Sequence, residues 1–181
     1  LENKIFYVAS YTYVRSKFSG LNGRLLPSSW DNEHLFSATL GYKFNNNWDL
    51  GVKYRFAGGS PYTPFNMLSS QQNYLAIGTG TFDYSRLNSE RLRSFSQTDL
   101  RVDKRINLRK TSINFYVDIQ NILKTQNASF PKYTFKRSDD NSNFVTTNGG
   151  PLQPNGSNGI PVILNESSGN LIPSLGINYE F

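Results

Sequence analysis

The apolar and polar residues of this chain alternate in six separate stretches. In five of them one parity is mostly apolar and the other mostly polar or small, which is the period of a β-strand with two unlike faces. In the first stretch both parities carry apolar residues, and only Ser10 and Thr12 mark the even positions as the wetter face. The expected strands span residues 4–18, 35–44, 48–56, 97–106, 113–120 and 171–181. The pattern therefore predicts an antiparallel, all-β fold.

A short turn at residues 45–47 joins the second and third expected strands. All three residues are asparagine, which tolerates the left-handed backbone conformation that tight hairpins need. Folding the chain about Asn46 places apolar residues opposite apolar ones and polar residues opposite polar ones. The expected pairs are Phe44 with Trp48, Tyr42 with Leu50, Leu40 with Val52, Lys43 with Asp49 and Thr39 with Lys53.

A second short turn, at residues 107–110, joins the fourth and fifth expected strands. Pairing across it sets Leu100 opposite Val117 and Val102 opposite Phe115. The same register places Arg101 diagonal to Asp118, within reach of an ion pair on the polar face.

The remaining connections, residues 19–33, 57–96 and 123–170, are long and rich in Gly, Pro, Asn and Ser. Structureless loops of this length count against a compact soluble domain. Outer-membrane β-barrels, in contrast, have short periplasmic turns and long extracellular loops. The alternation of short and long connections therefore favours a transmembrane barrel, with its long loops outside and its C-terminus in the periplasm.

Composition is compatible with this reading. Hydrophobic residues make up 37% of the chain and mean hydropathy is −0.51, so no stretch approaches the roughly 18 apolar residues of a membrane-spanning helix. Barrel strands hide their apolar content in alternation. The 13 Phe, 11 Tyr and 2 Trp residues suit the aromatic girdles of a barrel or, equally, the core of a β-sandwich.

The chain is basic, with a formal net charge of +6 and no cysteine. The densest basic groups are interleaved with Asp99 and Asp103, which argues against nucleic acid as a partner. Anionic lipid headgroups suit such a basic rim better.

The last strand carries Leu175, Ile177, Tyr179 and Phe181 on one parity. A terminal strand of this kind resembles the closing strand of a bacterial outer-membrane β-barrel, in which it is also the assembly signal. The smallest closed membrane barrels have about 8 strands. Six strands therefore predict that residues 1–181 are the C-terminal part of a larger barrel, whose other strands come from outside this sequence.

Four motifs in order narrow the family. Residues 58–65 contain Pro-Tyr-Thr-Pro, and Arg101, Asp103 and Arg105 form an Arg-x-Asp-x-Arg strand. Asp118 and Asn121 form an Asp-x-x-Asn strand end, and a terminal Phe follows. This order is similar to the C-terminal portion of TonB-dependent outer-membrane transporters, particularly those of Bacteroidota.

That resemblance implies a barrel of about 22 strands, of which this sequence would supply six. It also implies an N-terminal plug and a TonB box, and neither of these lies in this sequence. It implies energised import of a scarce nutrient such as a siderophore, an oligosaccharide or a peptide. The partners would be outer-membrane lipid, the rest of the barrel and plug, and TonB, with a surface lipoprotein or a larger complex as an open alternative. No catalysis and no cofactor are expected.

Two sets of candidate site residues follow. The charged residues on the polar face are expected to line the lumen, where an ion-pair network would stiffen the wall or contact the plug: Asp99, Arg101, Asp103, Arg105 and Asp118. The motif loop, together with the aromatic loop residues Tyr74, Phe82 and Tyr84, is expected at the extracellular mouth: Pro61, Tyr62, Pro64 and Phe65.

On the opposite face, seven residues are expected to meet lipid: Phe36, Leu40, Val52, Tyr54, Phe115, Val117 and Ile177. The only histidine, His34, has no adjacent catalytic motif and is expected at the barrel rim. Asp139, Asp140 and Asn141 form either a solvated loop tip or a calcium-binding loop. A passive porin, an adhesin-like barrel and a soluble all-β binding module remain as alternatives.

Overall fold

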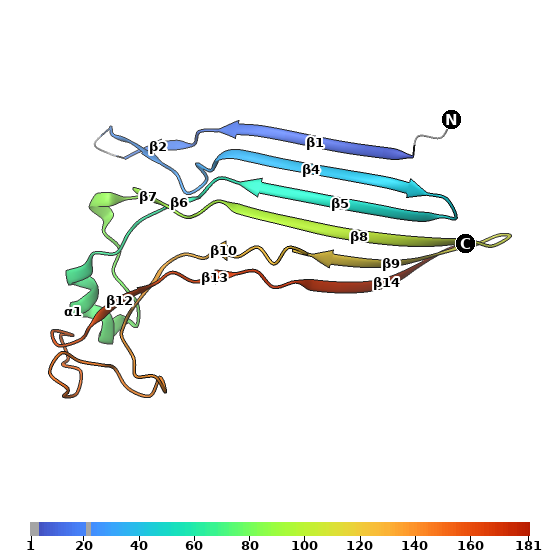
Figure 1. Cartoon of the computed structure of the whole chain (residues 1–181). Helices are drawn as coiled ribbons and strands as arrows, with labels where there is room; N and C mark the ends of the chain where they lie inside the picture. Colours follow the sequence, from blue (N-terminus) through green and yellow to red (C-terminus); the bar gives the residue numbers. More distant parts are fainter. Residues whose placement is uncertain (1–3, 21–22) are drawn as a thin grey trace.

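The largest element of the computed structural model is an antiparallel sheet of six strands (Figure 1). The structure describes residues 4–20 and 23–181. The strands follow one another in the order β1-β4-β5-β8-β9-β14, so each long strand pairs with the next long strand of the chain. Their bounds are Ile5–Val14 (β1), Glu33–Phe44 (β4), Trp48–Ala57 (β5), Phe95–Asn107 (β8), Ser112–Gln120 (β9) and Ile172–Glu180 (β14). The sheet is open, because β1 and β14 each keep one unpaired edge within the described chain.

The first hairpin has the register that the sequence predicts. Phe44 pairs with Trp48, Leu40 with Val52 and Thr39 with Lys53. Tyr42 likewise pairs with Leu50, and Lys43 with Asp49. Asn46 and Asn47 have φ values of 63° and 59°, the left-handed conformation expected of asparagine in this turn.

The predicted register of the second hairpin is wrong by two residues. Leu100 pairs with Ile119 and Val102 with Val117, while Arg101 lies directly opposite Asp118 rather than diagonal to it. The cause is the turn. Asn107 belongs to β8 and pairs with Ser112, and the loop comprises residues 108–111. Because side chains alternate with a period of two, the slip leaves every residue on its predicted face.

One face of the sheet is mostly apolar, and its polar residues lie toward the two ends of the strands: His34, Ser96, Thr98 and Lys104. Tyr7, Leu40, Val52, Leu100 and Ile119 lie side by side on successive strands. The adjacent row consists of Ile5, Tyr42, Leu50, Val102, Val117 and Leu175. The seven residues expected to meet lipid all lie on this face. The middle of this face is thus mostly aliphatic, with Tyr7 and Tyr42 as the aromatic residues of the two rows.

Aromatic side chains mark the two ends of the same face. Phe44, Trp48 and Phe115 lie toward the short turns, whereas Tyr11, Phe36 and Phe56 lie toward the long connections. Trp48 and Phe56 are eight positions apart on β5, or about 27 Å at the usual rise of a strand.

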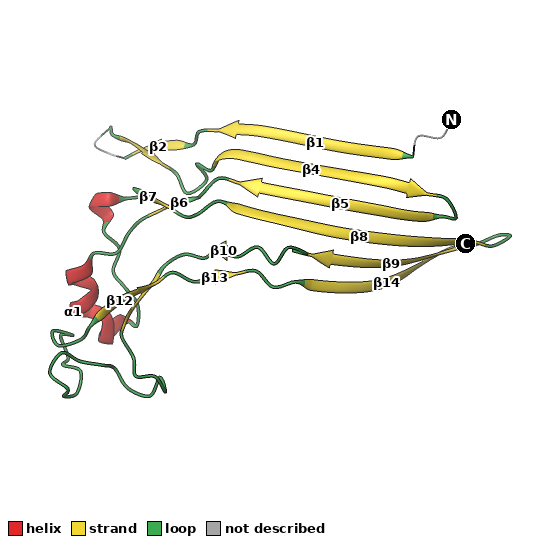
Figure 2. Ribbon diagram, viewed as in Figure 1, coloured by secondary structure: helices red, strands yellow, loops and turns green. Residues whose placement is uncertain are grey.

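All long connections lie at one end of the sheet, and both short turns at the other (Figure 2). The first expected strand breaks at Ser16, whose backbone N–H donates to Asp31. The short strands are β2 Lys17–Ser19, β3 Leu25–Pro27, β6 Pro61–Tyr62, β7 Glu90–Arg91, β10 Asn127–Ala128, β11 Lys132–Phe135, β12 Pro161–Leu164 and β13 Ser167–Ser168. The sequence had led us to expect connections without secondary structure. The structure instead shows eight short strands in their described residues.

A helix, α1 (Met67–Ile77), lies within the second connection and is followed by a single 3-10 turn, η1 (Tyr84–Arg86). The Asn66 side chain caps α1 by accepting from the Ser69 N–H at 2.9 Å. Gly78 ends it in the left-handed conformation, with its N–H on the Tyr74 carbonyl. No helix in the described ranges is long and apolar enough to cross a membrane.

The best-buried apolar side chains lie among the long connections and not on the sheet. Phe135 is 0% and Tyr133 3% exposed. Tyr74 of α1, Phe65 and Phe144 surround them with ring centroids 5.1–6.0 Å apart. This aromatic cluster joins α1 to β11, so the connections have a core of their own.

Candidate functional site

The polar face of the sheet is hollowed over β5, β8 and β9, in a concavity of about 700 Å³. All five residues expected to line a lumen border this hollow: Asp99, Arg101, Asp103, Arg105 and Asp118. The structure thus brings the predicted set together on one surface.

Arg101 and Asp103 form the tightest pair of this surface. The Arg101 guanidinium donates twice to the Asp103 carboxylate, each time at 2.9 Å, and Asn114 donates to the same carboxylate at 2.8 Å. Arg101 also lies 4.1 Å from the centre of the Tyr116 ring. The expected ion pair with Asp118 is wrong, because Asp103 on the same strand occupies the guanidinium in a bidentate contact.

Asp99 is the centre of a second cluster. Its carboxylate accepts from Arg55 at 3.0 Å, from Gln97 at 2.7 Å and from the Asn121 N–H at 3.0 Å. Arg55 was not among the candidates, although its parity on β5 places it on the polar face. Asn121 has a φ of 52°, which lets the chain leave β9 while its N–H still reaches Asp99.

Arg105, Asp118 and Lys53 form no hydrogen bond or ion pair within the described chain. The polar face therefore carries two clusters whose charged groups pair with each other, around Asp103 and around Asp99. Its other charged side chains, Arg105, Asp118 and Lys53, could contact a molecule bound in the hollow. Such a surface can hold a polar protein segment or a hydrated solute.

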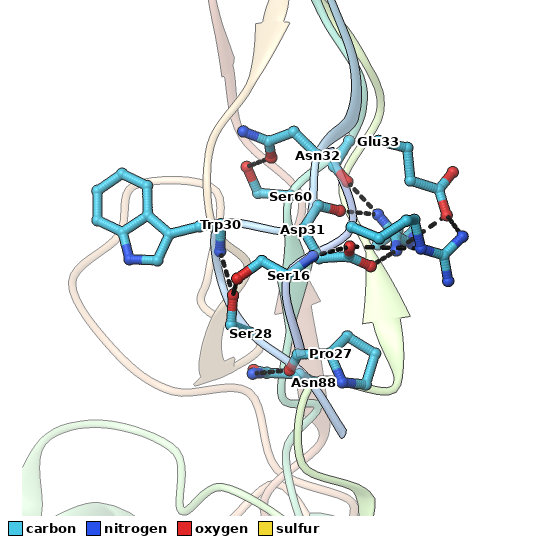
Figure 3. Close-up of polar contacts among 12 residues, drawn as sticks. Ser16, Pro27, Ser28, Trp30, Asp31, Asn32, Glu33, Ser60 and Asn88 are labelled. Carbon is cyan, nitrogen blue, oxygen red and sulfur yellow. Dashed lines mark hydrogen bonds and ion pairs between the residues drawn. The ribbon is translucent and has the colours of Figure 1, made fainter. Parts of the chain in front are cut away.

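Asp31 lies at the base of the long connections and is 0% exposed (Figure 3). Its carboxylate accepts from the Ser16 N–H at 2.7 Å and from Arg91 at 2.6 Å, with Arg15 at 3.5 Å. Arg91 also donates to the Asp31 and Gly59 carbonyls. These contacts tie both ends of the first connection to the second one.

Burial alone would raise the pKa of Asp31. The Ser16 N–H and the charges of Arg91 and Arg15 outweigh it, and the pKa lies below its ordinary value of 3.8. Asp31 is therefore an ionised, structural carboxylate. Sequence reasoning missed it, because its partners lie at widely separated positions of the chain.

The predicted mouth loop, residues 61–65, borders a smaller hollow of about 310 Å³ among the connections. Tyr62 and Phe65 line it together with Phe82, Tyr84 and Phe130, whereas Pro64 does not. The sequence pointed to Phe82 and Tyr84 but missed Phe130. Tyr74, also expected at the mouth, belongs to the buried aromatic cluster instead.

Hydrogen bonds hold this hollow in shape. Phe65 and Phe82 form a β-bridge, and their rings stack 5.2 Å apart at an angle of 10°. The Asp83 N–H donates to the Pro64 carbonyl at 2.8 Å. Asn88 donates to the Pro27 carbonyl at 2.7 Å through its side chain and to Thr63 at 3.0 Å through its N–H. Segments from all three long connections thus form one preorganised surface.

His34 lies on the apolar face at the loop end of β4, between Tyr11 and Tyr13. Its Nδ1 is 2.8 Å from the Tyr11 hydroxyl. In the described chain its contacts involve no carboxylate, so no catalytic triad is formed.

Asp140 organises its own loop. Its carboxylate accepts from the Ser138 hydroxyl and from the backbone and side chain of Ser142, and these hydrogen bonds lower its pKa to about 2. No cluster of acidic or histidine side chains able to hold a metal ion occurs in residues 4–20 and 23–181.

The residues expected to form an assembly signal lie along β14. Leu175, Ile177 and Tyr179 are exposed on the apolar face, beside the free edge of the sheet. Phe181 is also exposed and lies 6.1 Å from the Tyr179 ring.

Comparison with known protein families, with curated proteins and with solved structures finds no match to this chain. Similarity therefore assigns it no family, and its function has to be argued from the geometry.

Proposed function

We propose that this chain forms C-terminal strands of a TonB-dependent transporter of the bacterial outer membrane, which imports a scarce nutrient. The observation that carries the proposal is the continuous apolar face, aliphatic in the middle and aromatic at both ends. Soluble monomers rarely expose apolar patches larger than a few hundred Å². Here Leu40, Phe115, Val117, Leu175 and Ile177 are all exposed on one surface.

The dimensions support a bilayer as the partner of this face. On β5 the segment from Trp48 to Phe56 has nine residues, and a strand tilted by about 45° needs about 9–11 residues to cross the hydrocarbon core of a bilayer. Lipid offers no hydrogen bonds to the free edges of β1 and β14, so further strands have to pair with them. A larger barrel of about 22 strands satisfies that demand.

The polar face is then the lumenal wall, with the long connections outside the cell and the short turns in the periplasm. Arg101–Asp103 and Arg55–Asp99 stiffen the wall, while Arg105, Lys53 and Asp118 are left to contact a plug or a solute. The TonB-dependent class rests on the order of the four motifs along the chain. Arg101, Asp103, Arg105 and Asp118 of these motifs border the wall, and Pro61, Tyr62 and Phe65 border the smaller hollow among the connections.

Two measurements test the proposal in the producing bacterium. We expect the full-length protein in the outer-membrane fraction, resistant to alkaline carbonate and released only by detergent. We also expect the detergent-purified protein to capture the periplasmic domain of TonB. Release by carbonate would contradict the barrel, and an outer-membrane protein that fails to bind TonB would instead be a passive porin or an adhesin.

A further inference from the structure

Two properties of the loop hollow restrict the kind of ligand that it can bind. We call loop hollow the cavity lined by Tyr62, Phe65, Phe82, Tyr84 and Phe130. Its lining contains no charged side chain. Its volume of about 310 Å³ is at the lower end of small-ligand pockets, which hold roughly 300–1,000 Å³. The charges nearest to it, Arg86 and Glu90, pair with each other, so a charged ligand such as a ferric siderophore or a phosphate ester would have no unpaired counter-charge in the lining.

The aromatic rings of the hollow are exposed and fixed. Phe82 stacks on Phe65 and meets Tyr84 in a T-shaped contact, with centroids 6.3 Å apart at 64°. Phe82, Tyr84 and Phe130 all stay exposed. Two rings set at a steep angle offer a floor and a wall for one flat, partly apolar ring.

Hydroxyl groups accompany the rings. Ser29, Tyr62 and Tyr84 are among the lining residues, and their side-chain hydroxyls have no hydrogen-bond partner in the described chain. Burial, followed by the charge of Glu90, raises the pKa of Tyr62, so this hydroxyl remains a neutral donor and acceptor. Free neutral hydroxyls beside exposed ring faces match a ligand that is itself a hydroxylated ring.

We infer that this hollow is a binding site for one residue of a neutral saccharide, at the extracellular entrance of the proposed transporter. The C–H face of a pyranose would stack on Phe82 or Tyr84, while its hydroxyls would pair with Ser29, Tyr62 and Tyr84. An aromatic or proline side chain of a peptide would use the rings but would leave those three hydroxyls unpaired. The inference rests on the proposed function only for the role of the site as an entrance.

The test uses the full-length protein in lauryldimethylamine oxide, a detergent without a sugar headgroup. Binding to immobilised neutral oligosaccharides of glucose, mannose, xylose and galactose is compared with binding to oligogalacturonate and to a neutral peptide rich in Phe and Pro. We expect at least one neutral oligosaccharide to bind, and neither the acidic saccharide nor the peptide.

Three variants locate the site. Tyr84 is 72% exposed, so Tyr84→Ala removes a ring of the hollow without opening a core, and we expect binding to weaken about tenfold. Tyr84→Phe keeps the ring, removes the hydroxyl and should weaken binding less. Phe18→Ala is the matched control, because Phe18 is an exposed loop aromatic outside the hollow.

Absence of binding to every neutral oligosaccharide, or equal affinities of wild type and Tyr84→Ala, overturns the inference. Binding of the peptide in place of the saccharides does the same and assigns the hollow to peptides. These failures leave outer-membrane location and TonB binding intact. Saccharide binding by a protein that fails those two assays would refute the transporter and keep the site.

Discussion

Single residues hold the long connections in place, and Asp31 has the largest role among them. Its carboxylate is fully buried and contacts two arginines and one backbone N–H. Asp31 belongs to no recognisable sequence motif. No local pattern in the sequence could have revealed it, because Ser16 and Arg91 approach it only when two connections fold together. The charged residues on the polar face of β8, in contrast, could be predicted directly from their alternation in the sequence.

Asp31→Asn should loosen the connections by about 1–3 kcal/mol at neutral pH, since the amide cannot pair with Arg91 as a carboxylate does. Fluorescence of Trp30, the neighbouring residue, reports the change in a protein in which Trp48 and every tryptophan outside residues 1–181 are replaced by Phe. Asp140→Asn is the control. It alters an exposed carboxylate that bonds only within its own turn, and it should leave Trp30 fluorescence unchanged.

The same carboxylate gives a pH dependence. The folded-state pKa of Asp31 is lowered, so its stabilising contribution is complete above the unfolded pKa of about 3.9 and is lost as the pH falls through the lower folded value. We expect Trp30 fluorescence to stay constant from pH 7 to about 5 and to change below about 4. The change should be absent in Asp31→Asn, and an identical acid transition in both proteins would contradict the assignment.

Gly41 and Gly51 pair directly across β4 and β5 on the polar face but have different surroundings. A Cβ atom at Gly41 would collide with the Phe6 ring, whereas at Gly51 the nearest atom would lie 3.9 Å away. Gly41→Ala should therefore push the half-exposed Phe6 ring aside and lower stability more than Gly51→Ala does. Thermal unfolding in detergent compares the two, and equal losses would show that Phe6 does not cover Gly41.

At the scale of elements, alternation predicted the six long strands well and the connections poorly. The alternation of apolar and polar residues determines which side chains share a face of the sheet. The turn at residues 45–47 determines the register of the first hairpin, because three asparagines allow few other loop lengths. The turn after β8 offered several loop lengths, so its register was wrong by two. The α1 helix was missed because its apolar residues do not gather on one face of the helix, which is the pattern that marks a packed helix in a sequence. In the structure four of them are exposed: Met67, Leu68, Leu75 and Ile77.

Asn66 links α1 to the saccharide-sized hollow. It caps the helix through its side chain, and its N–H donates to the Thr81 carbonyl at 2.8 Å, beside Phe82. Asn66→Ala should lower helix stability by about 1 kcal/mol and weaken ligand binding through looser positioning of Phe82. Asn66→Asp keeps an N-cap acceptor and should restore both. Amide hydrogen exchange of residues 67–77 measures the first effect, and failure of Asp to rescue exchange would rule out the cap.

For the whole molecule, the central claim is that the two faces of the sheet meet different media. The sequence was sufficient to predict which residues share a face. It could not reveal the aromatic core of the connections, since Tyr74, Tyr133 and Phe135 are joined only by long-range packing. The apolar face has no such packing partner within the described chain, and we therefore propose the bilayer as its partner.

The most direct test places a lysine at one depth on either face. Leu40 lies on the apolar face of β4, midway between Phe36 and Phe44. Val8 lies on the polar face of β1 and pairs with Thr39, the residue next to Leu40, so the two positions lie at nearly the same depth. Assembly into outer membranes of the producing bacterium is measured for Leu40→Lys, Val117→Lys and the control Val8→Lys. We predict that the first two lose about 2–4 kcal/mol of stability in lipid and assemble poorly, while Val8→Lys assembles as the wild type does. Normal assembly of Leu40→Lys and Val117→Lys would contradict the account, because the apolar face would then not meet lipid.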